Sequence, residues 1–295
     1  MITPYLKATA FAPGHISAFF EPIFKPRNAE RTGSRGAGIC VSLGATSSVT
    51  IFPALKQTVT VRINNSSSPA PVTTTALSNL LEDLVVSVNV HTTLELPVSQ
   101  GFGMSAAGAL SACLAAGHLL NMPKECAVKA AHHAEVQHRT GLGDVISSSF
   151  GGIEIRREPG LPPWGLLEHI PGSFDLVLCV IGKKMMTTTI LSDQKKIDDI
   201  ATIGRYCTKK LLENPSIEHL LSLSQEFTRK TSLASDSVVR AIDAVKPYGK
   251  ASMCMLGNSV FAIGNTTMLC RVLAGFGKIY CCSIDTAGAR LITTV

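Results

Sequence analysis

Residues 97–110 read Pro-Val-Ser-Gln-Gly-Phe-Gly-Met-Ser-Ala-Ala-Gly-Ala-Leu and stand between two segments of contrasting pattern. Before them, apolar and polar residues alternate over 85–96, which predicts a half-buried β-strand. After them, Ser105 to Leu120 is rich in Ala, Leu and Gly, which predicts a buried helix. The stretch therefore predicts a strand, a glycine loop and a helix in succession.

This loop has the features of an anion site. Gly101 and Gly103 lack side chains, so the backbone can turn tightly there and approach a ligand closely. The free N–H groups and the positive dipole end of the following helix favour a phosphate. Ser105 places a hydroxyl at the helix entrance, where it suits a phosphate oxygen or a bound Mg²⁺.

The loop alone leaves other interpretations open. It also fits a plain glycine turn before a buried helix of small residues. The pattern Gly101-x-Gly103-x-x-Ala106 satisfies the dinucleotide-binding fingerprint as well. A Walker A loop is excluded, because no Gly-Lys-Ser/Thr follows.

Length and composition indicate a compact globular protein. A chain of 295 residues favours two domains, and 45% hydrophobic with 16% charged residues argues against disorder. The net charge of +6 is spread out, with neither a long basic run nor a basic stripe interleaved with aromatic residues. This distribution argues against nucleic acid as a partner and suits a small anionic substrate.

Nine cysteines occur without any C-x-x-C pair, a pattern typical of reduced thiols in the cytoplasm. The first twenty residues lack a long apolar core, so we expect no secretory signal. The longest apolar run, 106–120, contains Ser111 and His118 and is too short to span a membrane. We therefore expect a soluble cytoplasmic protein.

The N-terminal third predicts mostly strands. Residues 8–20 read as a strand interrupted by a turn at Pro13-Gly14, with His15 and Ser17 as a polar pair. Residues 32–38, Thr-Gly-Ser-Arg-Gly-Ala-Gly, predict a loop that either wraps a small anion or simply connects two strands. Alternation over 47–63 predicts a hairpin or meander, and 76–84 a short helix.

A second helix is predicted from Pro123 to about Arg139, with His132 and Glu135 on one face. It ends in a Gly-Leu-Gly-Asp loop that contains Asp144. Taken singly, Glu135 fits a solvated helix carboxylate and Asp144 a helix cap. Arg156 stands at the polar end of the next predicted strand.

Four prolines and two glycines between residues 158 and 171 predict a domain boundary, dividing the chain into 1–160 and 161–295. Beyond it we expect a strand over 174–181 and helices over 193–246. A strand, turn and strand should follow over 251–263. A last strand is expected after the Asp-Thr-Ala-Gly-Ala-Arg motif of 285–290.

Taken together and in order, these motifs resemble the GHMP kinases, the superfamily named for galactokinase, homoserine kinase, mevalonate kinase and phosphomevalonate kinase. The motifs that carry this resemblance are Ala-Pro-Gly-His-Ile-Ser (12–17), the central loop, Glu135 followed nine residues later by Asp144, and Met-Leu-Gly-Asn-Ser-Val-Phe-Ala (255–262). Within the superfamily the chain most resembles the archaeal pantoate kinases, through residues 12–17, 33–38, 255–262 and 285–290. The resemblance covers essentially the whole chain.

The resemblance implies an α+β fold of two domains with the active site between them. It implies ATP-dependent, Mg²⁺-requiring phosphorylation of pantoate to 4-phosphopantoate in coenzyme A biosynthesis. Ser105 would contact the phosphates and Mg²⁺, Glu135 would bind Mg²⁺, and Asp144 would either remove the acceptor proton or orient the hydroxyl. The ATP phosphates would be held by Pro97, Gly101, Phe102, Gly103, Met104, Ser105, Ala106, Ala107 and Gly108.

Pantoate carries a carboxylate, so its site needs a fixed cation. Arg156 and Arg35 are the candidates, with His132 and Ser34 as hydrogen-bond partners. His15 is also assigned to the substrate site, at a position where mevalonate kinase-like members carry Lys. The late glycine motif is sparse, because Gly257 stands alone where relatives often have several glycines.

Several alternatives remain open from the sequence. The chain fits a sister kinase acting on mevalonate, homoserine or shikimate, or a non-catalytic relative that binds nucleotide. A nicotinamide-dependent oxidoreductase is disfavoured, because a second helix, not a strand, follows the first. The resemblance also suggests a homodimer.

Overall fold

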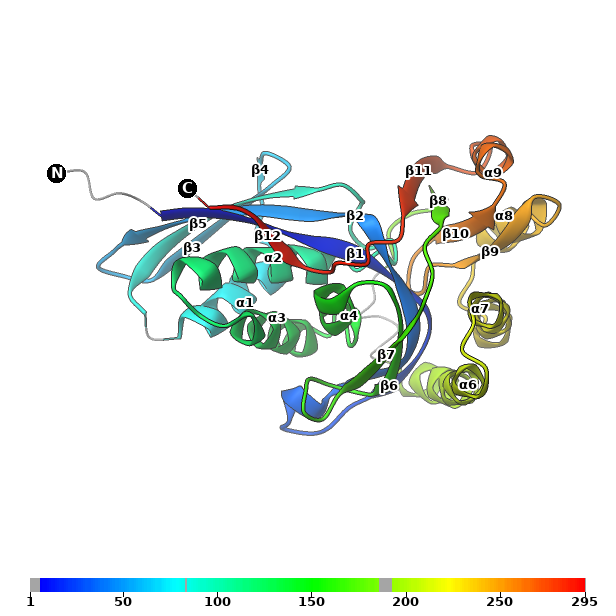
Figure 1. Ribbon diagram of the computed structural model, residues 1–295, viewed down its shortest axis with the longest axis horizontal. Helices are drawn as coiled ribbons and strands as arrows, with labels where there is room; N and C mark the ends of the chain where they lie inside the picture. Colours follow the sequence, from blue (N-terminus) through cyan, green and yellow to red (C-terminus); the bar gives the residue numbers. More distant parts are fainter. Residues whose placement is uncertain (1–5, 83, 186–192, 295) are drawn as a thin grey trace.

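The computed structural model describes residues 6–82, 84–185 and 193–294, which form a mixed α+β fold with two sheets (Figure 1). The larger sheet has the order β12-β1-β2-β5-β3-β4, with β6 paired to β2 and β7 to β6. The smaller sheet has the order β11-β8-β10-β9. The strands of the larger sheet are β1 (Leu6–Ile23), β2 (Gly33–Pro53), β3 (Thr58–Ile63), β4 (Ser66–Ser67), β5 (Val86–Leu94), β6 (Ile153–Glu158), β7 (Leu166–Ile170) and β12 (Arg290–Thr294).

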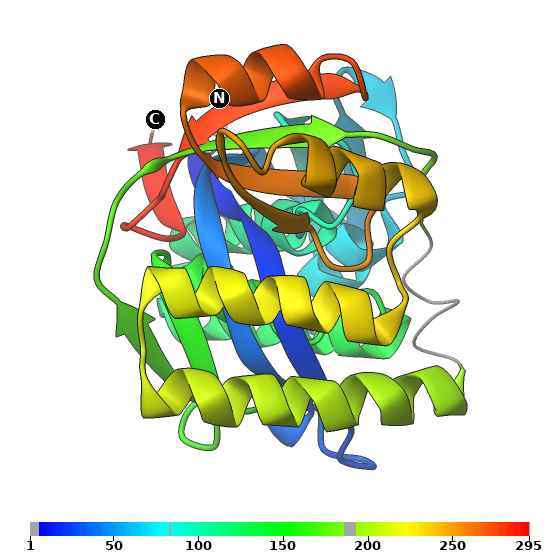
Figure 2. The same cartoon turned by 90° about the vertical axis from the view of Figure 1, so that its right-hand side faces the viewer.

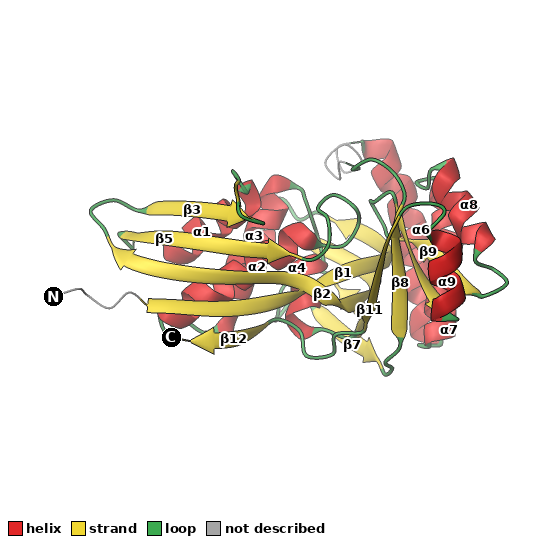
Figure 3. Cartoon of the chain, turned by 90° about the horizontal axis from the view of Figure 1, so that it is seen from above, coloured by secondary structure: helices red, strands yellow, loops and turns green. Residues whose placement is uncertain are grey.

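Helices cover one face of the larger sheet, as seen from above in Figure 3. These helices are α1 (Pro71–Leu81), α2 (Met104–Leu119), α3 (Lys124–His138) and α4 (Asp144–Phe150). Two longer helices, α6 (Gln194–Glu213) and α7 (Ile217–Thr231), lie across β1 (Figure 2). The smaller sheet comprises β8 (Asp175–Val180), β9 (Gly249–Met253), β10 (Ser259–Gly264) and β11 (Lys278–Ser283), packed with α8 (Asp236–Ala244) and α9 (Thr266–Leu273).

Helix α2 lies at the centre of the core. Every one of its residues is buried except Ser105 and His118, and it packs against β1, β2, α1 and α3. Its many Ala and Gly residues allow these neighbours to approach closely. Its buried hydroxyl, Ser111, donates to the carbonyl of Gly108 and lies 2.8 Å from Ser47 Oγ, so no polar group is left without a partner there. The predicted order of strand, glycine loop and helix is confirmed by β5 and α2.

The glycine-rich segment 32–38 was expected to be a loop, but residues 33–38 form the first part of β2 and pair with β1. Its glycines allow close packing instead of a turn. A Cβ on Gly38 would collide with the ring of His15, and one on Gly36 would collide with the backbone of Phe19. Strand β1 also runs through Pro13-Gly14 with only a shift of register, so the predicted interruption is wrong.

The predicted hairpin or meander over 47–63 is wrong as well, because β2 and β3 are not neighbours in the sheet. Strand β5 lies between β2 and β3, pairing antiparallel with β2 and parallel with β3. Alternation along a strand indicates which residues share a face, but it carries no information about which strand lies beside it.

The larger sheet contains strands from both sides of the domain boundary predicted near residue 160. Strands β7 and β12 follow residue 160 in the chain and nevertheless belong to the larger sheet. The 285–290 motif anchors this returning segment, because Asp285 Oδ1 accepts the N–H groups of Ala287 and Gly288 and Oδ2 accepts from Arg290 at 2.9 Å. The division into 1–160 and 161–295 stays a prediction.

Within the described ranges, no helix is both long and apolar enough to cross a membrane. All nine cysteines of the chain are free.

Candidate active site

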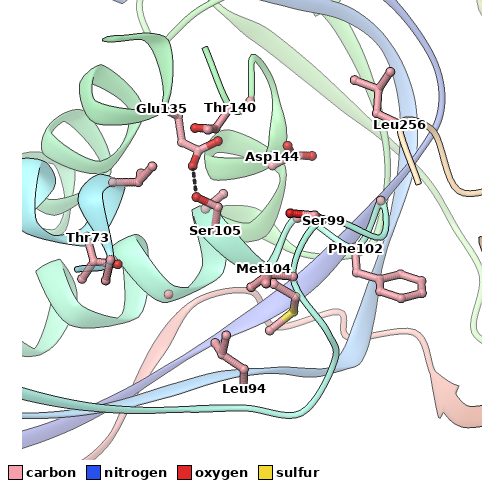
Figure 4. A pocket seen from close by; sticks show the side chains of 18 of the residues that line it. Thr73, Leu94, Ser99, Phe102, Met104, Ser105, Glu135, Thr140, Asp144 and Leu256 are labelled. Atoms are coloured by element: carbon pink, nitrogen blue, oxygen red, sulfur yellow. Dashed lines mark hydrogen bonds between the residues drawn. The ribbon is translucent and has the colours of Figure 1, made fainter. Parts of the chain in front are cut away.

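A cavity of about 360 Å³ lies at the start of α2, where the predicted loop meets the ends of α3 and α4 (Figure 4). One side of it is polar and includes Ser105, Glu135, Thr140 and Asp144. The other side is mainly apolar and includes Ile63, Pro69, Ala70, Val72, Leu94 and Val98. A cavity of this size, with one apolar and one polar side, fits a ligand with an apolar or aromatic part and a polar part.

The loop has the backbone geometry that its glycines predict. Gly101 and Gly103 have positive φ values of 77° and 61°, which few other residues adopt readily. Helix α2 begins at Met104 without any side-chain cap at its N-terminus. The N–H groups of its first turn are therefore left for a ligand, with the positive end of the helix dipole behind them.

The late glycine turn supports this loop from the other side. A Cβ on Gly257 would collide with the backbone of Gln100, and one on Gly101 would lie 2.7 Å from the carbonyl oxygen of Cys254. Ser259 Oγ donates to the Gln100 carbonyl at 2.6 Å. A single glycine at 257 thus permits two backbone segments to touch, which accounts for its place in the motif.

The side chains of Ser105 and Glu135 both line the cavity and are hydrogen-bonded to each other. Ser105 Oγ, at the start of α2, donates to Glu135 Oε1 on α3 at 2.6 Å (Figure 4). Burial raises the pKa of Glu135 to about 7, although the Ser105 hydrogen bond acts in the opposite direction. Asp144 contributes to the rise, because its charge repels a second carboxylate nearby. The solvated-carboxylate interpretation of Glu135 is excluded by its 2% exposure.

Asp144 faces the cavity and is held from behind by His15. Its Oδ1 lies 2.6 Å from His15 Nδ1, and His15 Nε2 lies 3.1 Å from Glu154 Oε1. Burial favours the neutral imidazole, but the two carboxylates outweigh it and raise the pKa of His15 above its usual value. A protonated His15 donates to both carboxylates and fixes the orientation of Asp144. His15 is not among the residues that line the cavity.

Arg156 lies in a second layer behind the cavity wall. It is 2% exposed, pairs with Glu154 through Nη1, and donates to Ser147 Oγ at 3.1 Å. Burial disfavours a charged Glu154, but His15 and Arg156 lower the pKa of that carboxyl below its usual value. Among the residues that the structure describes, the Nε–H of Arg156 has no hydrogen-bond partner.

Gly143 packs directly against this unpaired Nε–H. A Cβ on Gly143, which lines the cavity, would lie 2.6 Å from both Arg156 Nε and Ser34 Oγ. The absence of a side chain at Gly143 therefore allows its backbone to lie against Arg156 and Ser34, and Arg156 Nε is buried beneath it. Ser34 itself lines the cavity, as does Ser17, whose Oγ is 3.5 Å from Arg156 Nη2.

The other predicted site residues lie elsewhere. Arg35 lines a second cavity and donates to Glu158 Oε2 at 2.8 Å. His132 does not line the first cavity; its Nε2 lies 3.0 Å from the carbonyl oxygens of Ala29 and Thr32. Burial lowers the pKa of His132, so the neutral ring donates one N–H to this pair. Of the predicted loop residues, Pro97 and Ala107 are not among the lining residues, whereas Gly101, Phe102, Gly103, Met104, Ser105, Ala106 and Gly108 are.

Sequence reasoning missed Glu154 and Ser147, and it named Ser17 as a polar neighbour of His15 without assigning it to the site. One signal was available for Glu154, since Glu154 and Arg156 stand two apart in a strand and must point to the same face. Two opposite charges on the same face of a strand, with isoleucine on either side of Glu154, indicate a pair. Ser147 carries no comparable signal, because single serines on buried elements are common.

The oxygen donors at the start of α2 fit a magnesium ion that is shared with phosphates. Mg²⁺ takes one or two carboxylates together with phosphate oxygens and water. Ser105 Oγ and the Glu135 carboxylate provide a hydroxyl and one carboxylate beside the open helix N-terminus. Among the described residues no group of three or more His, Cys, Asp or Glu side chains could hold a metal ion, so an ion here needs phosphate as a further ligand.

Comparison with known proteins gives the family. Residues 72–152 match the model of the GHMP kinases N-terminal domain. The chain is 34% identical to the pantoate kinase of Methanospirillum hungatei, covering 97% of this chain and 96% of that protein. It is also 34% identical to the pantoate kinase of Thermococcus kodakarensis, covering 86% of each. A solved structure described as a phosphotransferase related to the CoA biosynthesis pathway superposes with a TM-score of 0.88 at 29% identity, covering 97% of this chain and 98% of that one. The chain belongs to the GHMP kinases, and within them to the family of the pantoate kinases.

Proposed function

We propose that the protein is an ATP-dependent kinase that phosphorylates pantoate to 4-phosphopantoate, a step toward coenzyme A. The observation that carries the proposal is a helix N-terminus open for phosphate beside the Ser105–Glu135 pair, with Asp144 facing the same cavity. Phosphoryl transfer depends on positioning and on neutralising charge, and these groups can do both. The relatives named pantoate kinase support the choice of acceptor.

In this proposal the adenine of ATP occupies the apolar side of the cavity, between α1 and β5. The phosphates lie against the first turn of α2, where backbone N–H groups and the helix dipole offset their charge. Ser105 and Glu135 hold Mg²⁺, which would neutralise charge that develops on the transferred phosphoryl group.

Asp144 accepts a hydrogen bond from the acceptor hydroxyl and directs its oxygen toward the phosphate. His15 holds the Asp144 carboxylate in place at 2.6 Å and is itself held by Glu154. These hydrogen bonds from His15 to Asp144 and Glu154 fix the Asp144 carboxylate before the substrate binds, so little reorganisation is needed during the reaction.

The carboxylate of pantoate is assigned to the polar wall of the cavity at Ser34 and Ser17. There it accepts hydrogen bonds from the two serine hydroxyls, which line the cavity, with the buried Arg156 guanidinium behind them, since Arg156 Nη2 lies 3.5 Å from Ser17 Oγ. A fixed cation close to a bound carboxylate favours its binding.

Gly143→Ala tests the carboxylate site. The backbone at Gly143 has φ −138°, so alanine causes no backbone strain, but its methyl group would lie 2.6 Å from Arg156 Nε and Ser34 Oγ and displace both side chains. We expect KM for pantoate to rise by about tenfold or more, with KM for ATP unchanged, in steady-state kinetics. Equal changes in both KM values would place the carboxylate elsewhere.

Glu135→Gln tests the metal site. Glutamine can still accept the Ser105 hydrogen bond but lacks the negative charge that a dication requires. We expect the Mg²⁺ concentration for half-maximal rate to rise and kcat to fall by about 10²-fold. An unchanged Mg²⁺ dependence would remove Glu135 from the metal site.

The product identifies the reaction. ³¹P NMR of a mixture with ATP, Mg²⁺ and pantoate should show a new phosphomonoester resonance that grows together with ADP. Release of inorganic phosphate without a phosphomonoester would indicate ATP hydrolysis and contradict the proposal. A cytoplasmic location and a homodimer remain predictions.

A further inference from the structure

A second cavity, of about 390 Å³, lies away from the first, where the end of β1, the β6–β7 connection and α6 come together (Figure 1). Its lining includes four cations and two carboxylates, which leave two positive charges in excess. The cations are Lys25, Arg31, Arg35 and Arg205, and the carboxylates are Glu21 and Glu158. This charge balance favours an anionic ligand.

The walls of this cavity are held in place by contacts that do not involve its lining cations. The backbone N–H of Leu161 donates to the carbonyl of Glu30 at 2.8 Å, which ties the β6–β7 connection to the short helix η1 (Ala29–Arg31). His132 on α3 binds the carbonyl oxygens at both ends of the same segment. The cavity is therefore preformed, as ligand sites usually are.

Within the part of the chain that the structure describes, two buried polar atoms of the lining residues have no hydrogen-bond partner, namely Arg35 Nε and Glu21 Oε2. Glu21 Oε2 forms only a long ion pair with Arg35 Nη1, at 3.8 Å. The other side-chain groups of these two residues are already engaged. Arg205 Nε donates to Glu21 Oε1 at 2.8 Å, and Arg35 Nη2 donates to Glu158 Oε2 at 2.8 Å. Buried groups without partners cost free energy, and a ligand with both an anionic oxygen and a hydroxyl would satisfy one donor and one acceptor at once.

Trp164 adds an apolar surface to the same cavity. The Arg31 guanidinium lies 4.3 Å from the centre of its ring, and the tryptophan remains 47% exposed. The ring can pack against the carbon skeleton of a small ligand while Arg31 binds its charged group.

We propose that this cavity is a second ligand site, which binds a small phosphate ester that also carries hydroxyl groups. The phosphate lies among Lys25, Arg31 and Arg205 and accepts a hydrogen bond from Arg35 Nε–H, and a hydroxyl of the ligand donates to Glu21 Oε2. Because cations on the cavity rim are partly exposed, binding weakens as salt concentration rises.

Trp164 is the only tryptophan of the chain, so its fluorescence reports on this cavity directly. The protein is titrated with glycerol 3-phosphate at constant ionic strength, with sodium chloride and glycerol as separate controls. We expect a saturable change in fluorescence with glycerol 3-phosphate, and no saturable change with either control. Lys25→Gln and Arg205→Gln, which leave the Arg31–Trp164 contact in place, should each weaken binding by about tenfold or more.

Two control variants distinguish binding in this cavity from a general effect of losing a positive charge and from binding in the first cavity. Arg157→Gln removes a nearby charge that pairs with Glu168 outside the cavity, and Gly143→Ala alters only the first cavity. Both should titrate like the unaltered protein. The proposal is overturned if the fluorescence does not saturate, if Lys25→Gln and Arg205→Gln bind as tightly as Arg157→Gln, or if Gly143→Ala abolishes the response.

Discussion

Replacing Asp144 with asparagine is expected to lower kcat by about 10²–10⁴-fold, the range for loss of a positioned acid–base group. Asparagine can still accept the hydrogen bond that His15 Nδ1 makes at 2.6 Å, so the fold should be retained. What is lost is the negative charge beside the acceptor hydroxyl. The measurement is the single-turnover rate at saturating ATP and pantoate, with the melting temperature as a check on folding.

The matched control for this variant is Asp198→Asn. Asp198 lies exposed on α6, where its Oδ1 accepts a hydrogen bond from Gln194. Its loss should leave kcat unchanged. If Asp144→Asn retained more than about a tenth of the activity, the acceptor hydroxyl would have to be oriented by another group.

Replacing Arg156 with alanine is expected to lower the free energy of unfolding by about 3–5 kcal/mol, because it leaves the buried carboxylate of Glu154 with His15 as its one remaining cationic partner among the described residues. In the surviving folded protein, KM for pantoate should also rise, since the charge of Arg156 is assigned to the substrate carboxylate. Urea unfolding measures the first effect and steady-state kinetics the second.

A double variant separates these two effects. Glu154→Gln combined with Arg156→Ala removes both charges, so it should lose less stability than the two single changes added together. KM for pantoate should stay high in the double variant. Arg157→Ala, which breaks only an exposed pair with Glu168, should change stability by less than about 1 kcal/mol. Additive losses in the double variant would mean that Glu154 and Arg156 are not energetically coupled.

The parts of the site that follow from local sequence were predicted well. A strand, two glycines and a helix of small residues over 85–120 specify their own geometry, because each element depends on neighbours within a few positions. The placing of Glu135 and Asp144 at the same cavity agrees with the order of motifs along the chain. That prediction required the resemblance to a family, since each residue alone fitted an ordinary surface role.

The parts that depend on distant contacts could not be predicted. The glycines at 33, 36 and 38 suggested a loop, but Gly36 and Gly38 allow β1 and the His15 ring to approach β2, and Gly33 allows the backbone of Gly160 to approach it. His15 was expected at the substrate, and nothing in its local sequence indicates a Glu154 that lies 139 positions further along. The insertion of β5 between β2 and β3 is likewise a consequence of tertiary pairing.

The central claim is tested most directly by ADP release from ATP and Mg²⁺ in the presence of pantoate, pantothenate, mevalonate, homoserine or shikimate. The account predicts strong turnover with pantoate alone, and its loss in Asp144→Asn. Turnover with a different acid, or ATP binding without turnover on any of them, would contradict it.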